Sequence, residues 1–459
     1  MEMDWSGKKI LVVGAGISGF AAARLAKKFG AEVMLSDAKA ESEIKGDCSA
    51  LREAGVVLLF GPQQESLLDG VDMVIVSPAV PERIPLIQAA YSRDISVLTE
   101  VELAYELSES PICAVTGTNG KTTTVTLLGL LLATRYDPVG VGGNIGVPLS
   151  EEALRVGKGG CIAAEISSYQ LEATKDFHPH IAAVLNVTPD HIVRHGSMDV
   201  YQKMKERIFA QQTAEDFLVL NYDDACTRSM KNRAASRVCF FSRREELTGG
   251  AFLCGSRLVI RWDGREYPLC TAEELGIKGG HNIENALAAA AAAFLAGCEP
   301  QAMIRVLREF HGVEHRIEYV RTVNGVAYYN DSKATNTDSA IKALETFSDG
   351  IVLLAGGDDK MTDLTEFMQL VRERVNDLIL IGDAAARFEK EALANGIDPE
   401  HIHRAGHSMD HAVRLAHELA HAPQVVLLSP ACASFDMYDG MAERGRDFKR
   451  LVNALQGES

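Results

Sequence analysis

Apolar residues along this chain fall into short runs that alternate with longer segments of helical periodicity. The run at 9–13 leads into a glycine-rich turn, followed by a helical segment that stops at Gly30 and by a second run at 32–37. Three further runs with helical patterns between them follow at 56–60, 72–78 and 95–98. Because such alternating units build a parallel sheet covered by helices, we expect a Rossmann-like domain over residues 1–100.

A second alternating block begins at residue 101, and we expect it to extend to residue 312. Its apolar runs are predicted strands at 112–116, 161–167, 181–187 and 216–221. The stretch 237–270 differs, because apolar and polar residues alternate there between glycine turns. That alternation predicts a small antiparallel sheet at the edge of this central domain.

The pattern restarts near residue 313 with four apolar runs, each of which ends in a polar or glycine-rich loop. Helical segments separate the runs, so we expect a second Rossmann-like domain over residues 313–459. The whole chain is thus predicted to be an α/β protein of three domains. In open parallel sheets ligands bind beyond the carboxyl ends of the strands, so the loops at those ends are where binding residues are expected.

Composition narrows the class of protein. At 459 residues the chain is too long for one hydrophobic core, and its net charge of −17 argues against a nucleic-acid or anionic-membrane partner. The nine cysteines include no CxxC pair, which favours reduced thiols over disulfides or a zinc site. The N-terminus lacks a signal-peptide pattern, and the most apolar stretch, 286–296, is too short to span a bilayer. We therefore expect a cytoplasmic protein that binds neither membrane nor nucleic acid.

The strongest chemical signal is the segment TGTNGKT at Thr116–Thr122, between an apolar run and a helical segment. Glycines let the backbone turn its N–H groups inward, Lys121 can reach terminal phosphates, and Thr122 can bind Mg²⁺. The segment departs from the P-loop consensus GxxxxGK[ST], because Val115 stands where the first glycine should be. The alternative is a glycine-rich turn with an unrelated lysine. We expect a P-loop ATPase-like domain that binds ATP here through Gly117, Thr118, Asn119, Gly120, Lys121, Thr122 and Thr123.

The first glycine-rich turn has the spacing of the dinucleotide-binding fingerprint. Gly14, Gly16 and Gly19 follow the first apolar run, and Asp37 ends the next one. This arrangement suits a pyrophosphate at the helix N-terminus and a ribose hydroxyl near Asp37. A redox dinucleotide and a UDP-sugar both contain those parts, and the glycines can also serve only to pack the helix on the strand. The residues leave all three alternatives open.

Two predicted strand ends in the central domain carry possible metal ligands. Glu165 ends a run near the phosphate loop, and Asp190 and His191 follow the next run. Mg²⁺ prefers oxygen ligands, which makes Glu165 a good candidate. A single histidine is more often a structural hydrogen-bonding residue, and only its place at the end of a strand favours a role for His191.

Three other polar residues have ambiguous roles. Lys205 shares a helical segment with Lys203, and both lysines would ordinarily be at the surface. Asn282 and Asn285 open an alanine-rich helix. Asn282 either caps that helix or, with Asn285 on the same face, hydrogen-bonds a nucleobase or phosphate.

In the third domain, cations and hydroxyls gather in the loops around the apolar runs. His315 and Arg316 precede the first run, and further polar segments lie at 331–336, 356–360 and 429–434. Such groups suit recognition of carboxylates or phosphates. Any one of them is compatible with a solvated loop, but four at one sheet edge favour a binding site.

Several of these segments together resemble the Mur ligase family: TGTNGKTTT, GGNIG, AEISSYQLE, NVTPDH, GGHNIENALAA, HRIE, NDSKATN, GGDDK and LSPACAS. The ordered set spans most of the chain and is far more specific than any single segment. LSPACAS followed by FDMYDGMAERG looks like the family member that adds D-glutamate, and the DNPR-type motif of the diaminopimelate-adding member does not occur.

The resemblance implies an ATP-dependent amide ligase that joins D-glutamate to UDP-N-acetylmuramoyl-L-alanine in peptidoglycan precursor synthesis. It implies ATP and two Mg²⁺ ions as cofactors, and we expect a monomer. The first domain would then bind UDP and not a redox dinucleotide, through Ile17, Ser18, Asp37 and Lys39. Lys39 stands where relatives often have arginine.

The same resemblance implies roles for residues of the other two domains. Implied in catalysis are Lys121, Asn144, His191 and Lys205. Implied as metal ligands are Thr122, Glu165, His191 and Lys205, the last as a carbamate formed with CO₂. Implied in contacts with the nucleotide are Asn282, Asn285, Arg316 and Asp331. Implied in binding D-glutamate are Lys333, Thr335, Lys360 and Ser434.

Three alternatives compete with this hypothesis. One is another amide ligase of the same superfamily, with a different amino acid or a folate substrate. Another is a nucleotide-sugar-binding regulator without catalysis, which intact Lys121, Glu165, His191 and Lys205 argue against. The third is a dehydrogenase that uses the first glycine-rich turn.

Overall fold

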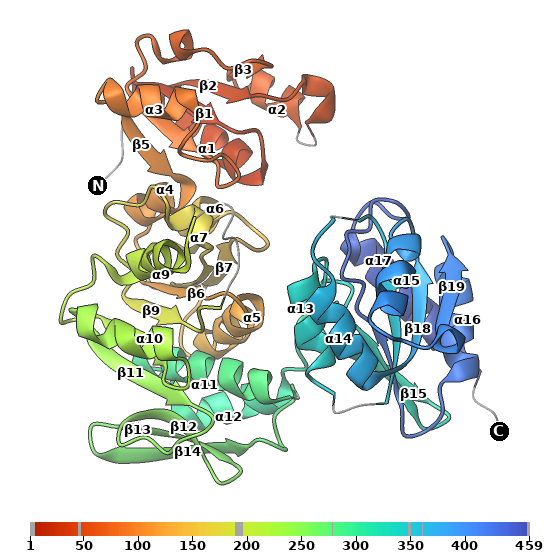
Figure 1. Cartoon of the computed structure of the whole chain (residues 1–459). Helices are drawn as coiled ribbons and strands as arrows, with labels where there is room; N and C mark the ends of the chain where they lie inside the picture. The colour runs from red at the N-terminus through yellow and green to blue at the C-terminus, as the bar shows by residue number, and fades with distance from the viewer. Residues whose placement is uncertain are drawn as a thin grey trace. The chain divides into compact units, whose positions relative to one another are not determined.

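The computed structural model of the chain describes residues 5–44, 47–188, 196–277, 279–347, 350–359 and 361–456, with the side chain of Asp338 also outside this set. The chain divides into two compact units, residues 1–310 and 311–459 (Figure 1). Among the described residues, no helix has the length and apolarity needed to cross a membrane.

The first unit begins with a five-stranded parallel sheet in the order β3-β2-β1-β4-β5. Its strands are β1 (Lys9–Val13), β2 (Glu32–Asp37), β3 (Val57–Phe60), β4 (Met73–Val76) and β5 (Ser96–Thr99). Its helices are α1 (Ile17–Lys28), α2 (Cys48–Glu53) and α3 (Pro85–Ser92). Alternate residues of β1 belong to two separate cores, Ile10 and Val12 to one and Leu11 and Val13 to the other. Both faces of the sheet are therefore covered, as a continuous apolar strand predicts.

The same unit contains a nine-stranded sheet in the order β14-β13-β12-β11-β10-β9-β6-β8-β7. Its strands are β6 (Ile112–Thr116), β7 (Val139–Gly143), β8 (Cys161–Glu165), β9 (Ile181–Val184), β10 (Phe217–Asn221), β11 (Arg237–Ser242), β12 (Gly250–Cys254), β13 (Arg257–Trp262) and β14 (Arg265–Thr271). Only β12, β13 and β14 form antiparallel pairs, and they extend the main sheet. The expectation that 237–270 is wholly antiparallel is wrong for β11, which pairs in parallel with β10 and β12.

Helices cover both faces of this sheet (Figure 1). They are α4 (Glu100–Leu107), α5 (Lys121–Leu132), α6 (Leu149–Val156), α7 (Ser168–Leu171), α9 (Met198–Glu206), α10 (Ala225–Met230), α11 (Gly280–Leu295) and α12 (Pro300–Glu309). The alanine run of α11 is completely buried, and α11 packs against α5. Alanine side chains let the two helix backbones approach closely, which holds the start of α11 beside the start of α5.

The second unit has a six-stranded sheet in the order β15-β16-β20-β17-β18-β19. Its strands are β15 (Glu318–Val323), β16 (Val326–Asn330), β17 (Ile351–Gly356), β18 (Val375–Ile381), β19 (Ile402–Gly406) and β20 (Val425–Leu428). Its helices are α13 (Thr337–Leu344), α14 (Thr365–Arg374), α15 (Ala385–Ala394), α16 (Met409–Leu419) and α17 (Met441–Ala454). The four predicted apolar strands form the middle of the sheet. The pattern missed β15 and β19, because edge strands are only partly buried and lack a continuous apolar run.

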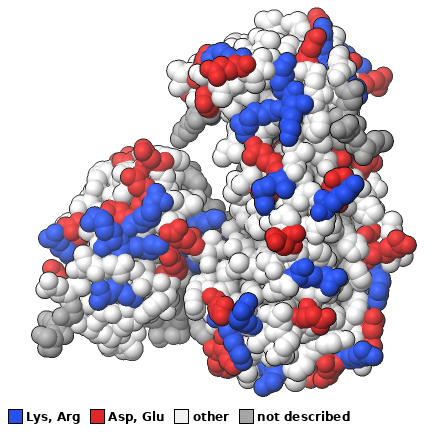
Figure 2. Space-filling view, turned by 180° about the vertical axis from the view of Figure 1, so that it is seen from behind, with Lys and Arg blue, Asp and Glu red and all other residues white. Residues whose placement is uncertain are grey.

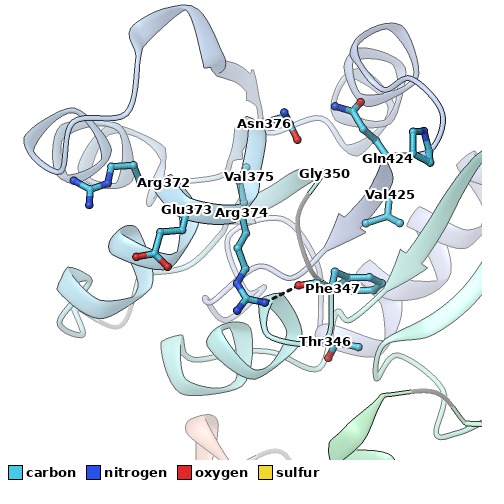
Figure 3. A pocket seen from close by; sticks show the side chains of 11 residues that line it. Thr346, Phe347, Gly350, Arg372, Glu373, Arg374, Val375, Asn376, Gln424 and Val425 are labelled. Carbon is cyan, nitrogen blue, oxygen red and sulfur yellow. Dashed lines mark hydrogen bonds between the residues drawn. The ribbon is translucent and has the colours of Figure 1, made fainter.

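A cavity of about 830 Å³ lies at one edge of the second sheet (Figure 3). It is lined by residues that precede or begin β17, β18 and β20, including Gly350, Val375 and Val425. Arg374 donates a hydrogen bond there to the carbonyl oxygen of Phe347 over 2.6 Å. The amino ends of the parallel strands meet at this edge, so the cavity lies opposite the loops that carry the predicted binding residues.

Acidic and basic side chains are interspersed over the face shown in Figure 2. Several are paired, as in the ion pair of Arg24 on α1 with Glu151 on α6. This pair links helices of the two sheets within the first unit. Because both side chains are largely exposed, the pair adds little to stability.

Candidate active site

The predicted phosphate-binding segment is a tight loop between β6 and α5. Gly120 is the residue before the helix and has φ of 83°, a left-handed value that favours glycine. A Cβ atom on Gly120 would lie 2.3 Å from Oδ1 of Asn285. Both the backbone angle and the close approach of α11 therefore require glycine at this position.

Asn186, just beyond β9, holds this loop in place. Its Oδ1 accepts a hydrogen bond from the backbone N–H of Asn119 over 2.8 Å, and its Nδ2 donates to the carbonyl of Asn119 over 3.2 Å. The backbone N–H of Thr118 donates to the carbonyl of Asn186 over 3.0 Å. This residue was not among those predicted from the sequence. The signal was there, because Asn186 lies in NVTPDH, directly after the strand that pairs with β6.

Lys121 is the first residue of α5 and lies against the loop. Its Nζ donates to the carbonyls of Gly117 and Thr118 over 2.8 and 2.9 Å. Thr122 and Thr123 are buried at the start of the helix. The helix N-terminus and the lysine together favour binding of a phosphate at this loop.

Glu165 ends β8, directly beside β6 in the sheet, and its carboxylate is almost completely buried at 2% exposure. Oε1 accepts a hydrogen bond from Nδ2 of Asn144 over 2.8 Å, and the backbone N–H of Asn144 donates to the carbonyl of Glu165. Within the described part of the chain, Oε2 has no hydrogen-bond partner. A buried carboxylate oxygen without a donor is costly unless a cation binds it. The donor set therefore fits Mg²⁺.

Lys205 on α9 is buried, at 1% exposure, so the expectation of a surface lysine is wrong for this residue, whereas its neighbour Lys203 is exposed. Its Nζ lies 4.4 Å from the centre of the Tyr201 ring. The Tyr201 hydroxyl is 3.2 Å from Oγ1 of Thr118. Tyr201, which the sequence analysis did not single out, thus connects the buried lysine to the phosphate loop.

Asn282 and Asn285 lie in the first turns of α11. The residue before this helix is Gly279, so the interpretation of Asn282 as an N-cap is wrong. Nδ2 of Asn285 donates to Oδ1 of Asn282 over 3.1 Å, and Thr124 of α5 donates to Oδ1 of Asn285 over 3.3 Å. Asn285 packs against Gly120 of the phosphate loop. Its contact with a nucleobase stays a prediction.

The glycine-rich turn after β1 is organised around Asp37. Its Oδ2 accepts the backbone N–H of Ala15 over 2.7 Å, and its Oδ1 accepts that of Lys39 over 2.9 Å. Ile17 at the start of α1 is 74% exposed. An apolar side chain held in solvent at a helix N-terminus, beside Ser18, is compatible with a ligand that covers it, and these ligand contacts stay predictions.

In the second unit, Asp331 brings the ends of three segments together. Its Oδ1 accepts the backbone N–H of Ile317 over 3.1 Å, and its Oδ2 accepts the hydroxyl of Ser429 over 2.8 Å. Burial raises the pKa of Asp331 to about 7, although the nearby charge of Arg316 favours the ionised form. The backbone N–H of Lys333 donates to the carbonyl of His315, which places Arg316, Asp331 and Lys333 at one end of the sheet.

Thr335 lies in the same loop as Lys333, and Ser434 lies in the loop that follows β20. Ser434 is buried, and Thr335 is half-buried. Ala433 and Asp358 exchange two backbone hydrogen bonds of 3.1 Å, which join the loop after β20 to the loop after β17. The guanidinium of Arg444, on α17, lies among these loops, and Arg444 was not among the residues predicted from the sequence.

Two predicted residues, His191 and Lys360, lie outside the described residues, as does Asp190. The structure brings Lys121, Glu165, Asn144 and Lys205 into the first unit with the phosphate loop. It brings Arg316, Asp331, Lys333 and Ser434 to one sheet edge of the second unit.

Comparisons with known proteins cover nearly the whole chain. Three models of Mur ligase domains match: the MurD-like N-terminal domain at residues 8–99, the middle domain at 115–293 and the glutamate ligase domain at 315–432. The UDP-N-acetylmuramoylalanine–D-glutamate ligase of Pelotomaculum thermopropionicum is 46% identical over 456 residues, which is 99% of this chain and 100% of that protein. The protein of the same name from Thermoanaerobacter pseudethanolicus is 42% identical over 454 residues, with the same shares covered.

Solved structures are similar in fold. A pseudomurein peptide ligase type C from Methanothermus fervidus has a TM-score of 0.59 at 18% identity, covering 97% of this chain and 100% of the other. The UDP-N-acetylmuramate–alanine ligase MurC of Thermotoga maritima has a TM-score of 0.57 at 19% identity, covering 97% and 99%. The predicted α/β fold is thereby confirmed.

Proposed function

This chain belongs to the Mur ligase family, and from that premise we propose that it joins D-glutamate to UDP-N-acetylmuramoyl-L-alanine at the expense of ATP. The full-length relatives of that name support the substrates. One observation carries the proposed chemistry. Glu165 ends the strand beside the one that leads into the phosphate loop, and its buried Oε2 accepts no hydrogen bond from the described residues. The product would be a cytoplasmic precursor of peptidoglycan, made by a monomer.

The reaction has two steps that suit a site built for positioning charge. The L-alanyl carboxylate attacks the γ-phosphorus of ATP, the bond to the β–γ bridging oxygen breaks, and ADP leaves with an acyl phosphate formed. The amine of D-glutamate, after losing a proton, attacks the acyl carbon, and the bond to phosphate breaks to give the amide. An acyl phosphate is already activated, so the protein mainly orients the reactants and neutralises charge.

The residues of the first unit supply the phosphoryl-transfer half. Lys121 would leave the loop carbonyls to pair with the terminal phosphates, while Asn186 and Asn285 keep the loop backbone in position. Thr122 and Glu165 would hold Mg²⁺, with Asn144 orienting the Glu165 carboxylate. When bound, Mg²⁺ would supply positive charge that offsets the triphosphate.

A second Mg²⁺ site would need an anion from Lys205. Its amine is buried 4.4 Å from the centre of the Tyr201 ring, and reaction with CO₂ requires the neutral form of that amine. As a carbamate, Lys205 would offer oxygen ligands to the ion, and His191 would offer a ring nitrogen.

The Lys205→Ala variant should then lose most activity, with the surface variant Lys203→Ala as its matched control. Full activity of Lys205→Ala and no response of the wild type to added bicarbonate would contradict the carbamate.

The remaining roles follow the three proposed domains, residues 1–100, 101–312 and 313–459. The first would hold UDP through Ile17, Ser18, Asp37 and Lys39. The nucleotide of ATP would contact Asn282, Asn285, Arg316 and Asp331. D-glutamate would be received by Lys333, Thr335, Lys360 and Ser434.

The deciding experiment measures phosphate release from ATP with UDP-N-acetylmuramoyl-L-alanine, with and without D-glutamate. We expect rapid release only with both substrates, and little with L-glutamate, L-lysine or L-alanine. Release that needs a different amino acid would overturn the specificity. An absence of release with every acceptor would favour a binding protein without catalysis.

A further inference from the structure

Arg444 of α17 is the largest fully buried side chain among the residues that the structure describes, at 1% exposure. Four of its N–H groups donate hydrogen bonds. Nε donates to Oγ of Ser332 over 3.0 Å, Nη2 to the carbonyls of Ser332 and Cys432 over 2.9 and 3.1 Å, and Nη1 to the carbonyl of Ala433 over 2.9 Å. A guanidinium has five such donors, so it is nearly saturated by protein acceptors.

The acceptors come from two loops at the carboxyl ends of neighbouring strands. Ser332 belongs to the loop after β16, and Cys432 and Ala433 belong to the loop after β20. The loop after β17 lies against the same group, because a Cβ on Gly357 would be 3.1 Å from Nη1 of Arg444. One guanidinium therefore touches all three loops.

This cation is buried, and none of the described residues gives it a direct counter-ion. Within the described residues no carboxylate lies within ion-pair distance of Arg444, although Asp331 and Asp436 attract it from further away. Burial lowers its pKa to about 10, so it stays protonated at neutral pH. Burying an unpaired charge is unfavourable, and a hydrophobic residue would hold a core together at lower cost. An apolar side chain, however, could not donate hydrogen bonds to the carbonyls of these loops.

We propose that Arg444 is a positioning residue that holds the amino-acid-receiving loops in register with one another. The residues that it bonds directly precede the predicted carboxylate-binding residues: Ser332 precedes Lys333, and Ala433 precedes Ser434. D-glutamate carries two carboxylates, and binding both requires that groups on separate loops keep fixed spacing. This inference rests on the proposed function, because it takes the loops of the second unit as the amino-acid site.

The test is the Arg444→Lys variant in the full-length protein. Lysine keeps the positive charge but cannot donate to four acceptors in a plane. We expect the KM for D-glutamate to rise about tenfold or more, because misplacement of a binding group by about 1 Å has a large effect. The KM values for ATP and for UDP-N-acetylmuramoyl-L-alanine should stay within about twofold, and guanidinium loss should spare kcat at saturating D-glutamate. Arg450→Lys on the same helix, at an exposed side chain, is the matched control.

A purely structural role would give a different result. If all three KM values and the melting temperature changed together, or if the KM for D-glutamate stayed as in the wild type, the inference would be wrong. If Arg444→Lys does not fold, Ser332→Ala decides the question, because it removes the acceptor of Nε and should raise the KM for D-glutamate alone by about threefold. If wild-type protein releases phosphate only with another amino acid, the proposed function fails, and the same variants measured with that amino acid still test Arg444.

Discussion

Two groups of loops at the carboxyl ends of parallel strands are fastened in opposite ways. In the first unit, the side-chain amide of Asn186 holds the phosphate loop by accepting from the N–H and donating to the carbonyl of one residue, Asn119. In the second unit, the guanidinium of Arg444 gathers three carbonyls and a hydroxyl. An amide both donates and accepts, whereas a guanidinium only donates. A loop that presents both an N–H and a carbonyl can therefore be held by an amide, whereas loops that present mainly carbonyls need a side chain that only donates.

The difference also suits the charge that each site is predicted to receive. The neutral amide leaves Lys121 as the cation at the phosphate loop, where it can change partners when a triphosphate binds. The buried Arg444 is permanently engaged by protein acceptors and provides fixed positive potential below loops that are predicted to bind carboxylates. In the first region a neutral amide holds the loop and the charged Lys121 can change partners. In the second region the charged group, Arg444, itself holds the loops together.

The largest effect should come from removing the mobile charge. We expect Lys121→Ala to lower kcat for phosphate release by at least about 10²-fold, because a positioned cation that neutralises the transferring phosphoryl group is lost. The melting temperature should stay near that of the wild type, since the bonds of Nζ to the carbonyls of Gly117 and Thr118 lie within its own loop. Lys158→Ala, at a side chain that is 82% exposed, is the control. Equal rates for the two variants would mean that phosphate is bound elsewhere.

The next largest effect should come from adding a side-chain atom to the phosphate loop at Gly120. Gly120→Ala introduces a Cβ 2.3 Å from Oδ1 of Asn285 at φ of 83°, and we expect about 1–3 kcal/mol of lost stability together with a higher KM for ATP. Gly159→Ala shares the positive φ, at 91°, but has nothing within 4 Å of the new atom. Thermal melts of both variants separate backbone strain from the clash. If they lose the same stability, Asn285 does not restrict the loop.

A smaller effect should distinguish the two fasteners directly. Asn186→Ala leaves the N–H and the carbonyl of Asn119 without their partner, and we expect the KM for ATP to rise about tenfold, the equivalent of one lost polar contact. The KM for D-glutamate should not change, which is the reverse of the pattern expected for Arg444→Lys. Asn376→Ala, at the far edge of the second sheet, is the control (Figure 3). Equal changes in both KM values for Asn186→Ala would contradict the separation of the two regions.

The smallest effect concerns pH and applies only to the second region. Asp331 has a pKa of about 7 in the folded chain and about 4 when unfolded, so between these values the folded chain binds more protons. Its contribution to stability is present below about pH 4 and is lost as the pH rises to about 7. The melting temperature should therefore fall across this window, and Asp331→Asn, which keeps an oxygen acceptor for the N–H of Ile317 but has no ionisable carboxyl, should reduce the fall. An unchanged pH dependence in Asp331→Asn would show that another group is responsible.

Much of the fold could be predicted because it depends on local patterns. Continuous apolar runs such as 112–116 identify strands buried on both faces, and the two Rossmann-like sheets and the phosphate loop follow from their spacing. The predictions that failed concern strand pairing and edge strands, which depend on residues that are distant in the sequence. β11 was grouped with the glycine-rich hairpin strands that follow it, yet its apolar run from Val238 to Phe241 pairs in parallel with β10. The edge strand β19 is too polar to be recognised.

The candidate site divides in the same way. The order of residues was enough to identify the loop with Lys121, the carboxylate at the end of β8 and the family to which the ordered motifs belong. The folded chain was needed to show that Lys205 is buried, that Asn186 holds the phosphate loop and that Arg444 lies among three loops. Arg444 bonds Ser332 from 112 positions away, and Asn186 bonds Asn119 from 67. A hydrogen bond depends on the distance between atoms, and residues so far apart in the sequence are brought together only by the packing of whole strands and helices.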